Sequence, residues 1–255
     1  MREHSRNNDD LQLVYGIRAV SEAITSGKEI DRLFIQEGLQ SNLFNDLRKI
    51  CRQYDIHFTM VPVYKLNKIA PGKNHQGAVA FLSPITYHQI DKLLPALFEE
   101  GKVPLVLILD RITDVRNFGA IARSAECSGV NAIIIPSRGA AQVNGDAIKT
   151  SAGALHKIAV CREDNLKTTI DYLKNSGLKI IACTEKGGVP HYSADLTGPA
   201  AIIMGSEEDG ISGEYLKRAD TKVMIPMKGE ISSLNVSVAT GVVLFEILRQ
   251  RSQFQ

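Results

Sequence analysis

Short apolar runs alternate with helical patterns through the carboxy-terminal part of the chain. The runs are, in chain order, PLVLILD, NAIIIPS, LKIIACT, AAIIMGS and KVMIP. Amphipathic segments lie between several of them, and an apolar helix with the sequence NVSVATGVVLFEIL follows the last. Continuous apolar strands separated by helices are typical of a parallel sheet covered on both faces. Residues 104–255 are therefore predicted to form an α/β domain.

The amino-terminal part has its own alternation of helical and strand patterns. Helices are expected at GIRAVSEAITSG and SNLFNDLRKICRQYD, and strands at DRLFIQE, IHFTMVP and GAVAFLS. Residues 11–85 are therefore predicted to be a separate small α/β unit. Residues 86–103 are expected to be a linker with a short helix interrupted at Pro95, and the polar residues 1–10 a flexible tail.

The last helix raises a question about its first turn. Its apolar residues surround most of the helix circumference, which predicts deep burial. Yet Ser232, Ser233 and Asn235 stand at its start. These polar groups either cap the helix or line a ligand pocket, because a helix amino terminus presents free N–H groups.

Composition narrows the class of protein only a little. The formal net charge is +2, and the chain has four cysteines in no CxxC pair and six histidines in no HxxxH pattern. We therefore expect reduced cysteines, no metal site and a cytoplasmic protein with no membrane segment. Four arginines near strand ends, Arg111, Arg116, Arg123 and Arg138, suit phosphate binding, although a solvated or salt-bridged surface is the more usual explanation for any one of them.

Three strand ends carry candidate chemistry. The first leads into NFGAIAR, where Asn117 and Arg123 are either ligand-binding residues or a helix cap and a surface charge. In the second, IIMGSEEDGIS, Gly205 and Gly210 serve either close approach to a ligand or a simple turn. The third is the polar turn before the last helix. Because ligands collect at the carboxyl ends of parallel strands, these three loops predict one pocket.

Common nucleotide and hydrolase signatures are absent. The sequence contains no GxGxxG, no GxxxxGK[ST] and no GxSxG. A pocket with asparagine, arginine, glutamate and serine, but without an evident histidine base or metal cluster, favours group transfer over hydrolysis.

Taken in this order, NFGAIAR, IIMGSEEDGIS and IPMKGEISSLNVSVA resemble the three motifs of the SpoU or TrmH family of RNA ribose 2′-O-methyltransferases. The resemblance covers residues 104–250 and includes KTSAGALHK between the first two motifs. The first unit, with NHQGAVA, is similar to the RNA-binding domain of the family's 23S ribosomal RNA guanosine methyltransferases, which resembles the ribosomal protein L30e fold. The resemblance implies a SPOUT-type parallel sheet with a trefoil knot, a homodimer and an RNA partner.

The resemblance also implies the cofactor and the residues of the site. S-adenosyl-L-methionine is expected to be the methyl donor. Five residues are expected to take part in catalysis or substrate positioning: Arg123, Asn117, Glu207, Ser233 and Asn235. Five are expected to contact the cofactor: Gly205, Ile225, Leu234, Asn235 and Thr184. No metal is implied.

Two positions depart from the usual family pattern, and two other functions stay open. Val115 stands where many members have proline, and Ser206 where many have asparagine. Both positions flank the motif residues. The alternatives are a transfer-RNA ribose methyltransferase and a non-catalytic RNA-binding protein.

Overall fold

The computed structural model describes residues 13–252 apart from 142, 186 and 232. The chain passes from one compact unit to a second between Thr86 and Tyr87. The expected tail, residues 1–10, and Ser232 lie outside the described residues.

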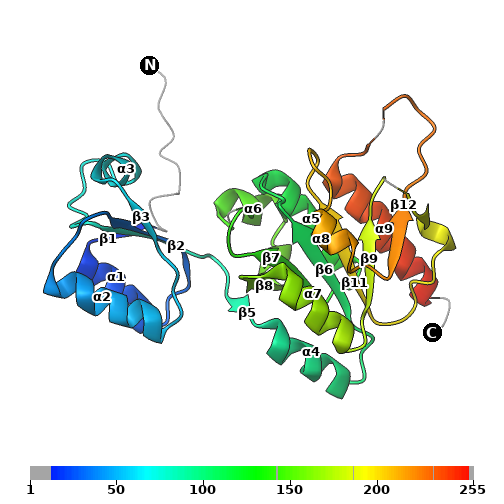
Figure 1. Ribbon diagram of the computed structural model, residues 1–255, viewed down its shortest axis with the longest axis horizontal. Helices are drawn as coiled ribbons and strands as arrows, with labels where there is room; N and C mark the ends of the chain where they lie inside the picture. The colour runs from blue at the N-terminus through cyan, green and yellow to red at the C-terminus, as the bar shows by residue number, and fades with distance from the viewer. Residues whose placement is uncertain (1–12, 142, 186, 232, 253–255) are drawn as a thin grey trace. The chain divides into compact units, whose positions relative to one another are not determined.

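The small unit is a four-stranded sheet with helices on both faces (Figure 1). In sheet order the strands are β1 (Leu13–Tyr15), β4 (Ala78–Leu82), β2 (Ile30–Gln36) and β3 (Thr59–Val61). The helices are α1 (Ile17–Thr25), α2 (Asn42–Gln53) and α3 (Val63–Ile69).

Side-chain alternation along β2 divides this unit into two cores. Leu33 and Ile35 pack with α1 and α2, whereas Phe34 faces the smaller cluster beneath α3. β4 runs antiparallel to β1 and β2, and β2 pairs in parallel with β3. The sequence predicted two helices and three strands here, and α3 and β1 were missed because both are short.

The large unit contains an eight-stranded sheet in which every pairing is parallel. In sheet order the strands are β10 (Val189–Pro190), β12 (Thr221–Met224), β9 (Lys179–Cys183), β11 (Ala200–Gly205), β6 (Leu105–Asp110), β7 (Ala132–Pro136), β8 (Ala159–Glu163) and β5 (Tyr87–His88). The central strands β6 and β11 are buried along nearly their whole length, as continuous apolar strands require. The predicted α/β fold with a parallel sheet is confirmed. The trefoil knot and the L30e likeness stay predictions.

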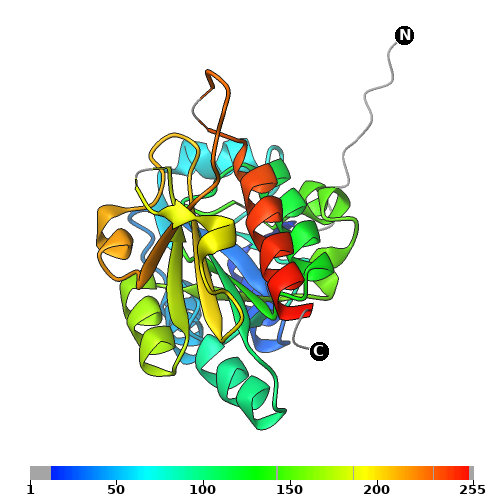
Figure 2. The same cartoon turned by 90° about the vertical axis from the view of Figure 1, so that its right-hand side faces the viewer.

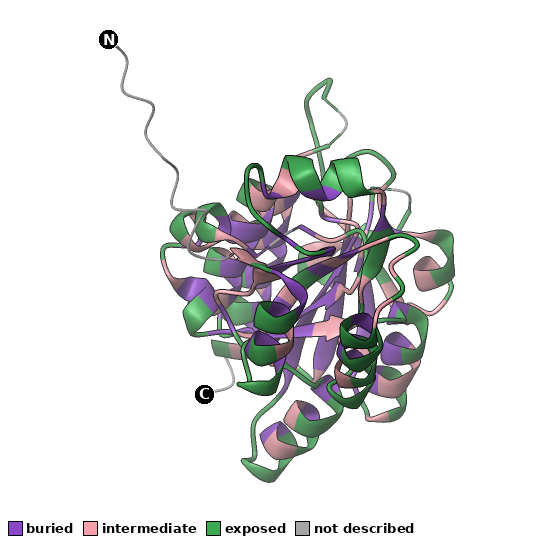
Figure 3. Cartoon of the chain, turned by 90° about the vertical axis from the view of Figure 1, so that its left-hand side faces the viewer, coloured by how far each residue is buried: buried purple, intermediate pink, exposed green. Residues whose placement is uncertain are grey.

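Helices cover both faces of the large sheet, and buried residues concentrate along the strands (Figures 2 and 3). α4 (Ile90–Glu99), α7 (Leu166–Asn175) and α8 (Gly213–Leu216) pack into one core with the sheet. On the other face α5 (Val115–Cys127) packs beside α9 (Val236–Ser252). The short elements are α6 (Gly145–Thr150), η2 (Ala154–His156) and η3 (His191–Ser193).

The segment expected to be a linker belongs to the large unit. β5 pairs with β8, and Ile90 and Leu94 of α4 are buried in the core. Pro95 lies inside an uninterrupted α4. Proline cannot donate to the carbonyl of Asp91 four residues earlier, but the Tyr172 hydroxyl donates to that oxygen at 3.5 Å. Apolar contacts that link distant segments therefore override the local signal for a connector.

The segment KTSAGALHK is divided, because α6 ends at Thr150 and positive φ angles at Ala152 and Gly153 turn the chain before η2. One other helix prediction needs correction. α9 is not buried all round, since Val238 and Phe245 are half exposed. The structure contains no helix, among the residues that it describes, that is long and apolar enough to span a membrane.

Candidate functional site

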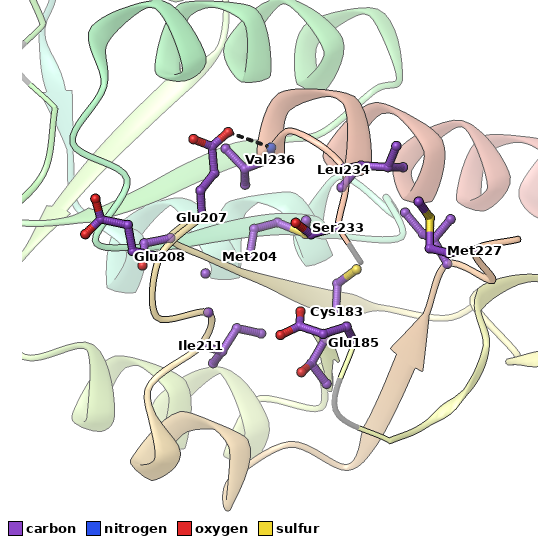
Figure 4. Close-up of a pocket in the computed structure, with 16 residues that line it drawn as sticks. Cys183, Glu185, Met204, Glu207, Glu208, Ile211, Met227, Ser233, Leu234 and Val236 are labelled. Carbon is purple, nitrogen blue, oxygen red and sulfur yellow. Dashed lines mark hydrogen bonds between the residues drawn. The ribbon is translucent and has the colours of Figure 1, made fainter. Parts of the chain in front are cut away.

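A cavity of about 290 Å³ lies where the strands β9, β11 and β12 end. This edge of a parallel sheet is where ligands are expected. Six of the predicted site residues line it (Figure 4): Thr184, Gly205, Glu207, Ile225, Ser233 and Leu234. The second and third loops therefore converge as the sequence predicted.

Gly210, which the sequence also marked, lines the cavity as well. Nine further lining residues were not predicted from the sequence: Cys183, Glu185, Met204, Ser206, Glu208, Ile211, Met227, Val236 and Ala239. Most flank a predicted residue, and the end of β9 supplies two of them beside Thr184. Their position at a strand end indicated which segment would reach the site, but it did not indicate which individual residues of that segment would line the cavity.

Asn117, Glu207 and Asn235 form one hydrogen-bonded cluster that joins all three loops. The Asn235 side-chain amide donates to Glu207 Oε1 at 2.5 Å and to Asn117 Oδ1 at 3.0 Å. The Asn117 amide donates to the same Glu207 oxygen at 3.3 Å. Charged acceptors form strong hydrogen bonds, so the Glu207 carboxylate ties the first and third loops to the second.

The polar turn before α9 both caps the helix and reaches the pocket. Asn235 Oδ1 accepts from the backbone N–H of Ser237 at 3.0 Å, as an N-cap residue does. Glu207 accepts from the backbone N–H of Val236 at 3.2 Å, the bond drawn in Figure 4. A carboxylate at a helix amino terminus is favoured by the helix dipole. Ser233 lines the cavity instead, and Asn235 is not among the lining residues.

The first loop differs in detail from its prediction. α5 begins at Val115, and its N-cap is Asp114, whose Oδ1 accepts from the backbone N–H of Asn117 at 2.7 Å. The side chain of Asn117 is thereby free to join the cluster.

Arg123 lies two turns further along α5 and is not part of this cluster. Its side chain is exposed and makes no hydrogen bond or ion pair with any residue that the structure describes. Glu207 does not bond to Arg123, because its hydrogen bonds are with the two asparagines and with the start of α9.

Asp110 and Arg111 hold the second loop from the end of β6, and the sequence analysis missed this role. The buried Asp110 carboxylate accepts from the backbone N–H of Ser212 at 2.7 Å. Arg111 donates to Asp209 at 2.8 Å and to the Gly210 carbonyl at 3.1 Å. Arg111 has φ 59°, a conformation that non-glycine residues seldom adopt. Arg111 thus belongs to the loop scaffold, whereas the sequence had grouped it with phosphate-binding arginines.

The fold of the loop after β11 requires glycine at position 205. A Cβ atom there would lie 2.1 Å from the carbonyl carbon of Gly210 and 2.3 Å from the backbone nitrogen of Ile211. The loop returns over the strand end, where Ser206 and Gly210 form an isolated bridge. The close approach of the loop backbone therefore requires glycine at this position, and the residue also lines the cavity.

The lining is chemically mixed and carries negative charge. Glu185, Glu207 and Glu208 contribute carboxylates, and no lysine, arginine or histidine is found among the lining residues that the structure describes. Burial, with a smaller contribution from Glu185, raises the pKa of the Cys183 thiol to about 11. Cys183 is therefore a neutral, weakly nucleophilic part of the wall at neutral pH. A cationic ligand suits this lining.

Comparison with known proteins identifies the family. Residues 104–245 match the model of the SpoU rRNA Methylase family, and residues 13–88 match the model described as RNA 2′-O ribose methyltransferase substrate binding. The chain belongs to the SpoU rRNA Methylase family. It is an RNA methyltransferase of the SpoU/TrmH type, and its two units correspond to the two matched regions.

Relatives and solved structures agree with this assignment. A Staphylococcus epidermidis protein assigned to the TrmH family of tRNA/rRNA methyltransferases is 36% identical over 250 residues, which are 97% of this chain and 98% of that protein. The SpoU methyltransferase AviRb from Streptomyces viridochromogenes, solved in complex with AdoMet, has a TM-score of 0.61 at 24% identity and covers 98% of this chain and 95% of its own. The A. aeolicus TrmH/SpoU tRNA modifying enzyme has a TM-score of 0.55 at 32% identity, over 65% of this chain and 85% of its own.

Proposed function

We propose that this SpoU protein transfers a methyl group from S-adenosyl-L-methionine to a ribose 2′-hydroxyl of RNA, a guanosine of 23S ribosomal RNA being the favoured target. The observation that carries the proposal is the convergence of the three motifs on one cavity edge through Asn117, Glu207 and Asn235. The match of the small unit to a 2′-O ribose substrate-binding model supports the ribose as acceptor.

The cavity suits the proposed cofactor. Ile225, Leu234 and Met204 supply apolar surface for an adenine, and the strand and loop ends provide backbone donors and acceptors beside them. The carboxylates of the lining favour the positively charged sulfonium. AviRb, which has the same fold, is the structure solved with AdoMet.

The roles of the protein side chains follow from their chemistry. S-adenosyl-L-methionine, when bound, would supply an activated methyl group to the 2′-oxygen, with S-adenosylhomocysteine as the leaving group and one proton released from the hydroxyl. A guanidinium is a hydrogen-bond donor with no acceptor site, so we assign Arg123 to the RNA phosphate and to the developing alkoxide charge rather than to proton removal. Asn117 and Asn235 orient the ribose, with Glu207 holding both amides, and Ser233 contacts the nucleotide or the methionine end of the cofactor.

The choice of ribosomal over transfer RNA rests on the separate small unit. The A. aeolicus tRNA modifying enzyme matches only 65% of this chain, whereas the rRNA methyltransferase from Sinorhizobium meliloti matches 93%. Transfer RNA remains the second candidate, because the S. epidermidis relative belongs to a family of tRNA/rRNA methyltransferases. A cytoplasmic location follows from either substrate.

A homodimer accounts for the exposed apolar side of α9. Val238, Val242, Phe245 and Leu248 follow helical spacing, and between 36% and 52% of each is exposed. α9 itself packs beside α5 (Figure 2). Multi-angle light scattering should give the mass of a dimer, and Phe245→Glu should give that of a monomer.

Calorimetry and RNA mapping test the function. We expect one S-adenosyl-L-methionine per subunit in the presence of EDTA, and one 2′-O-methyl site that disappears from cellular RNA when the protein is removed. Mapping ribosomal and transfer RNA together distinguishes the two substrates. Absence of cofactor binding would leave the non-catalytic RNA-binding interpretation, and binding abolished by EDTA would contradict a metal-free site.

A further inference from the structure

The small unit carries a basic surface on the side of its sheet covered by α3. Residues 56–77, which form β3, α3 and the loop to β4, contain Lys65, Lys68 and Lys73 and no aspartate or glutamate. All three lysines are exposed. The opposite side is mixed in sign, since in α2 Lys49 pairs with Asp46 at 3.2 Å. We call the basic side the α3 face and define it by Tyr15, Phe34, Tyr64 and the three lysines.

Two of these lysines are held over aromatic rings of one cross-strand row. Lys65 Nζ lies 5.9 Å from the centroid of the Phe34 ring, and Lys73 Nζ lies 5.7 Å from that of Tyr15. Tyr15 and Phe34 both pair with Val79, one on each side of β4. The backbone positions of the two residues are therefore about 10 Å apart, two strand spacings. The sheet thus sets the spacing of two ammonium groups.

The loop that carries Lys73 is held in one conformation from beneath. His75 is buried, and its Nδ1 accepts from the backbone N–H of Gly77 at 3.0 Å. Its Nε2 therefore carries the proton and donates to Asn67 Oδ1 at 2.9 Å. Gln76 adopts φ 49° to complete the turn. A preformed loop loses little conformational entropy when it binds a ligand.

Tyr64 adds an uncovered aromatic ring to the same surface. It is 70% exposed and stands in the first turn of α3, directly before Lys65 and one turn before Lys68. Aromatic rings beside cations are the usual means of holding single-stranded nucleic acid, because bases stack on the ring while phosphates meet the charges.

We propose that the α3 face is where the small unit binds a single-stranded segment of its RNA substrate. Lys65, Lys68 and Lys73 contact phosphates, and Tyr64 stacks on a base. The inference deepens the proposed function, on which it rests for the choice of RNA as ligand. A-form duplexes are contacted mainly through phosphates and 2′-hydroxyls and offer no free base to Tyr64.

Fluorescence anisotropy with the full chain tests this surface. The probes are a mixed-sequence RNA of 20 nucleotides and the same strand annealed to its complement. The triple variant Lys65→Gln, Lys68→Gln, Lys73→Gln removes the charges and keeps most of each side-chain stem. Its matched control is Arg48→Gln, Lys49→Gln, Arg52→Gln on α2. Tyr64→Ala removes the ring.

In the lysine variant, the slope of log affinity against log salt for the single strand should fall in magnitude by about 2, because each of the three lost phosphate contacts contributes roughly 0.7. The α2 control should change this slope by less than about 0.7. Tyr64→Ala should weaken single-strand binding at least about fivefold without changing the slope, and should leave duplex binding unchanged.

An unchanged slope in the lysine variant, or an equal fall in the α2 control, would overturn the proposal. So would equal sensitivity of duplex and single strand to Tyr64→Ala. S-adenosyl-L-methionine calorimetry on the same proteins separates this result from the proposed function. If the variants bind both cofactor and RNA normally, only the proposal for the α3 face is rejected. If the unaltered protein does not bind the cofactor, the proposed transfer reaction is rejected.

Discussion

The Asn235 side-chain nitrogen lies 2.5 Å from Glu207 Oε1, although the two residues are 28 positions apart in the sequence. The same oxygen accepts from the backbone of Val236 at the start of α9. One carboxylate thus joins the loop after β11 to the helix that follows β12. The interaction orders the cavity edge before any ligand arrives.

Glu207→Ala should lower the free energy of unfolding by about 1 kcal/mol, the usual cost of removing a helix cap, and should weaken cofactor binding as well. Thermal denaturation with and without S-adenosyl-L-methionine measures both effects. Glu208→Ala is the matched control, because Glu208 lines the cavity but forms no hydrogen bond with a residue that the structure describes. Equal stability of the two variants would contradict the capping role.

Arg123→Ala should reduce methyl transfer on the order of a hundredfold, with little change in cofactor affinity. Arg123 is exposed on α5 and is not a lining residue of the cavity, so its removal leaves the pocket intact. Arg123→Lys should restore little activity, because an ammonium lacks the planar fork of the guanidinium. Single-turnover transfer and cofactor titration are the measurements. Near-normal methyl transfer by Arg123→Ala would show that Arg123 is a surface charge without a role in catalysis.

Gly205→Ala should destabilise the protein by roughly 2 kcal/mol, because the added Cβ would overlap the backbone of Gly210 and Ile211. Displacement of the 206–212 loop should also abolish cofactor binding. Gly213→Ala, in open space at the start of α8, is the control and should change little. Chemical denaturation of both variants gives the comparison. A stable Gly205→Ala protein would show that the loop relaxes easily.

Cys183 should react slowly with iodoacetamide at pH 8 and faster as the pH rises towards its pKa of about 11. The thiolate is the nucleophile, and burial disfavours it. Bound S-adenosylhomocysteine should protect Cys183, since this residue lines the cavity, and should leave the exposed Cys127 unprotected. Peptide mass spectrometry after timed labelling separates the two sites. Equal labelling of Cys183 with and without S-adenosylhomocysteine would show that the ligand binds elsewhere.

Glu246 should stabilise the protein at neutral pH and lose this effect in acid. Hydrogen bonds from Arg249, at 2.7 and 2.8 Å, are the main cause that lowers the pKa of Glu246 from 4.5 to about 2. Because the folded-state pKa is the lower one, the stabilisation is complete above about pH 4.5 and is lost as the pH falls towards 2. Glu246→Gln should therefore unfold more easily than the unaltered protein at pH 7, with the difference disappearing near pH 2. Denaturant midpoints across this range test the prediction, and a difference independent of pH would refute it.

Most of the elements could be predicted from local pattern. The buried strands β6, β7, β9, β11 and β12 were evident because continuous apolar runs have few alternatives in an α/β domain. The strand end that carries Gly205 was marked for the same reason, whereas Thr184 and Ile225 were implied only by the family resemblance. Prediction failed at the segment 86–103, where partners distant in sequence, β8 and the core beneath α4, decide the structure.

The sequence by itself determined the α/β class, the two-unit organisation and the loops that carry chemistry, because periodicity and motif spacing are properties of neighbouring residues. Only the tertiary structure decided how individual side chains are used. It joined Asn117 to Asn235 through Glu207, and it tied Arg111 to Asp209 rather than leaving it for a phosphate. These pairs lie 118 and 98 positions apart along the chain. No local pattern specifies such contacts, since they depend on which strands become neighbours in the sheet.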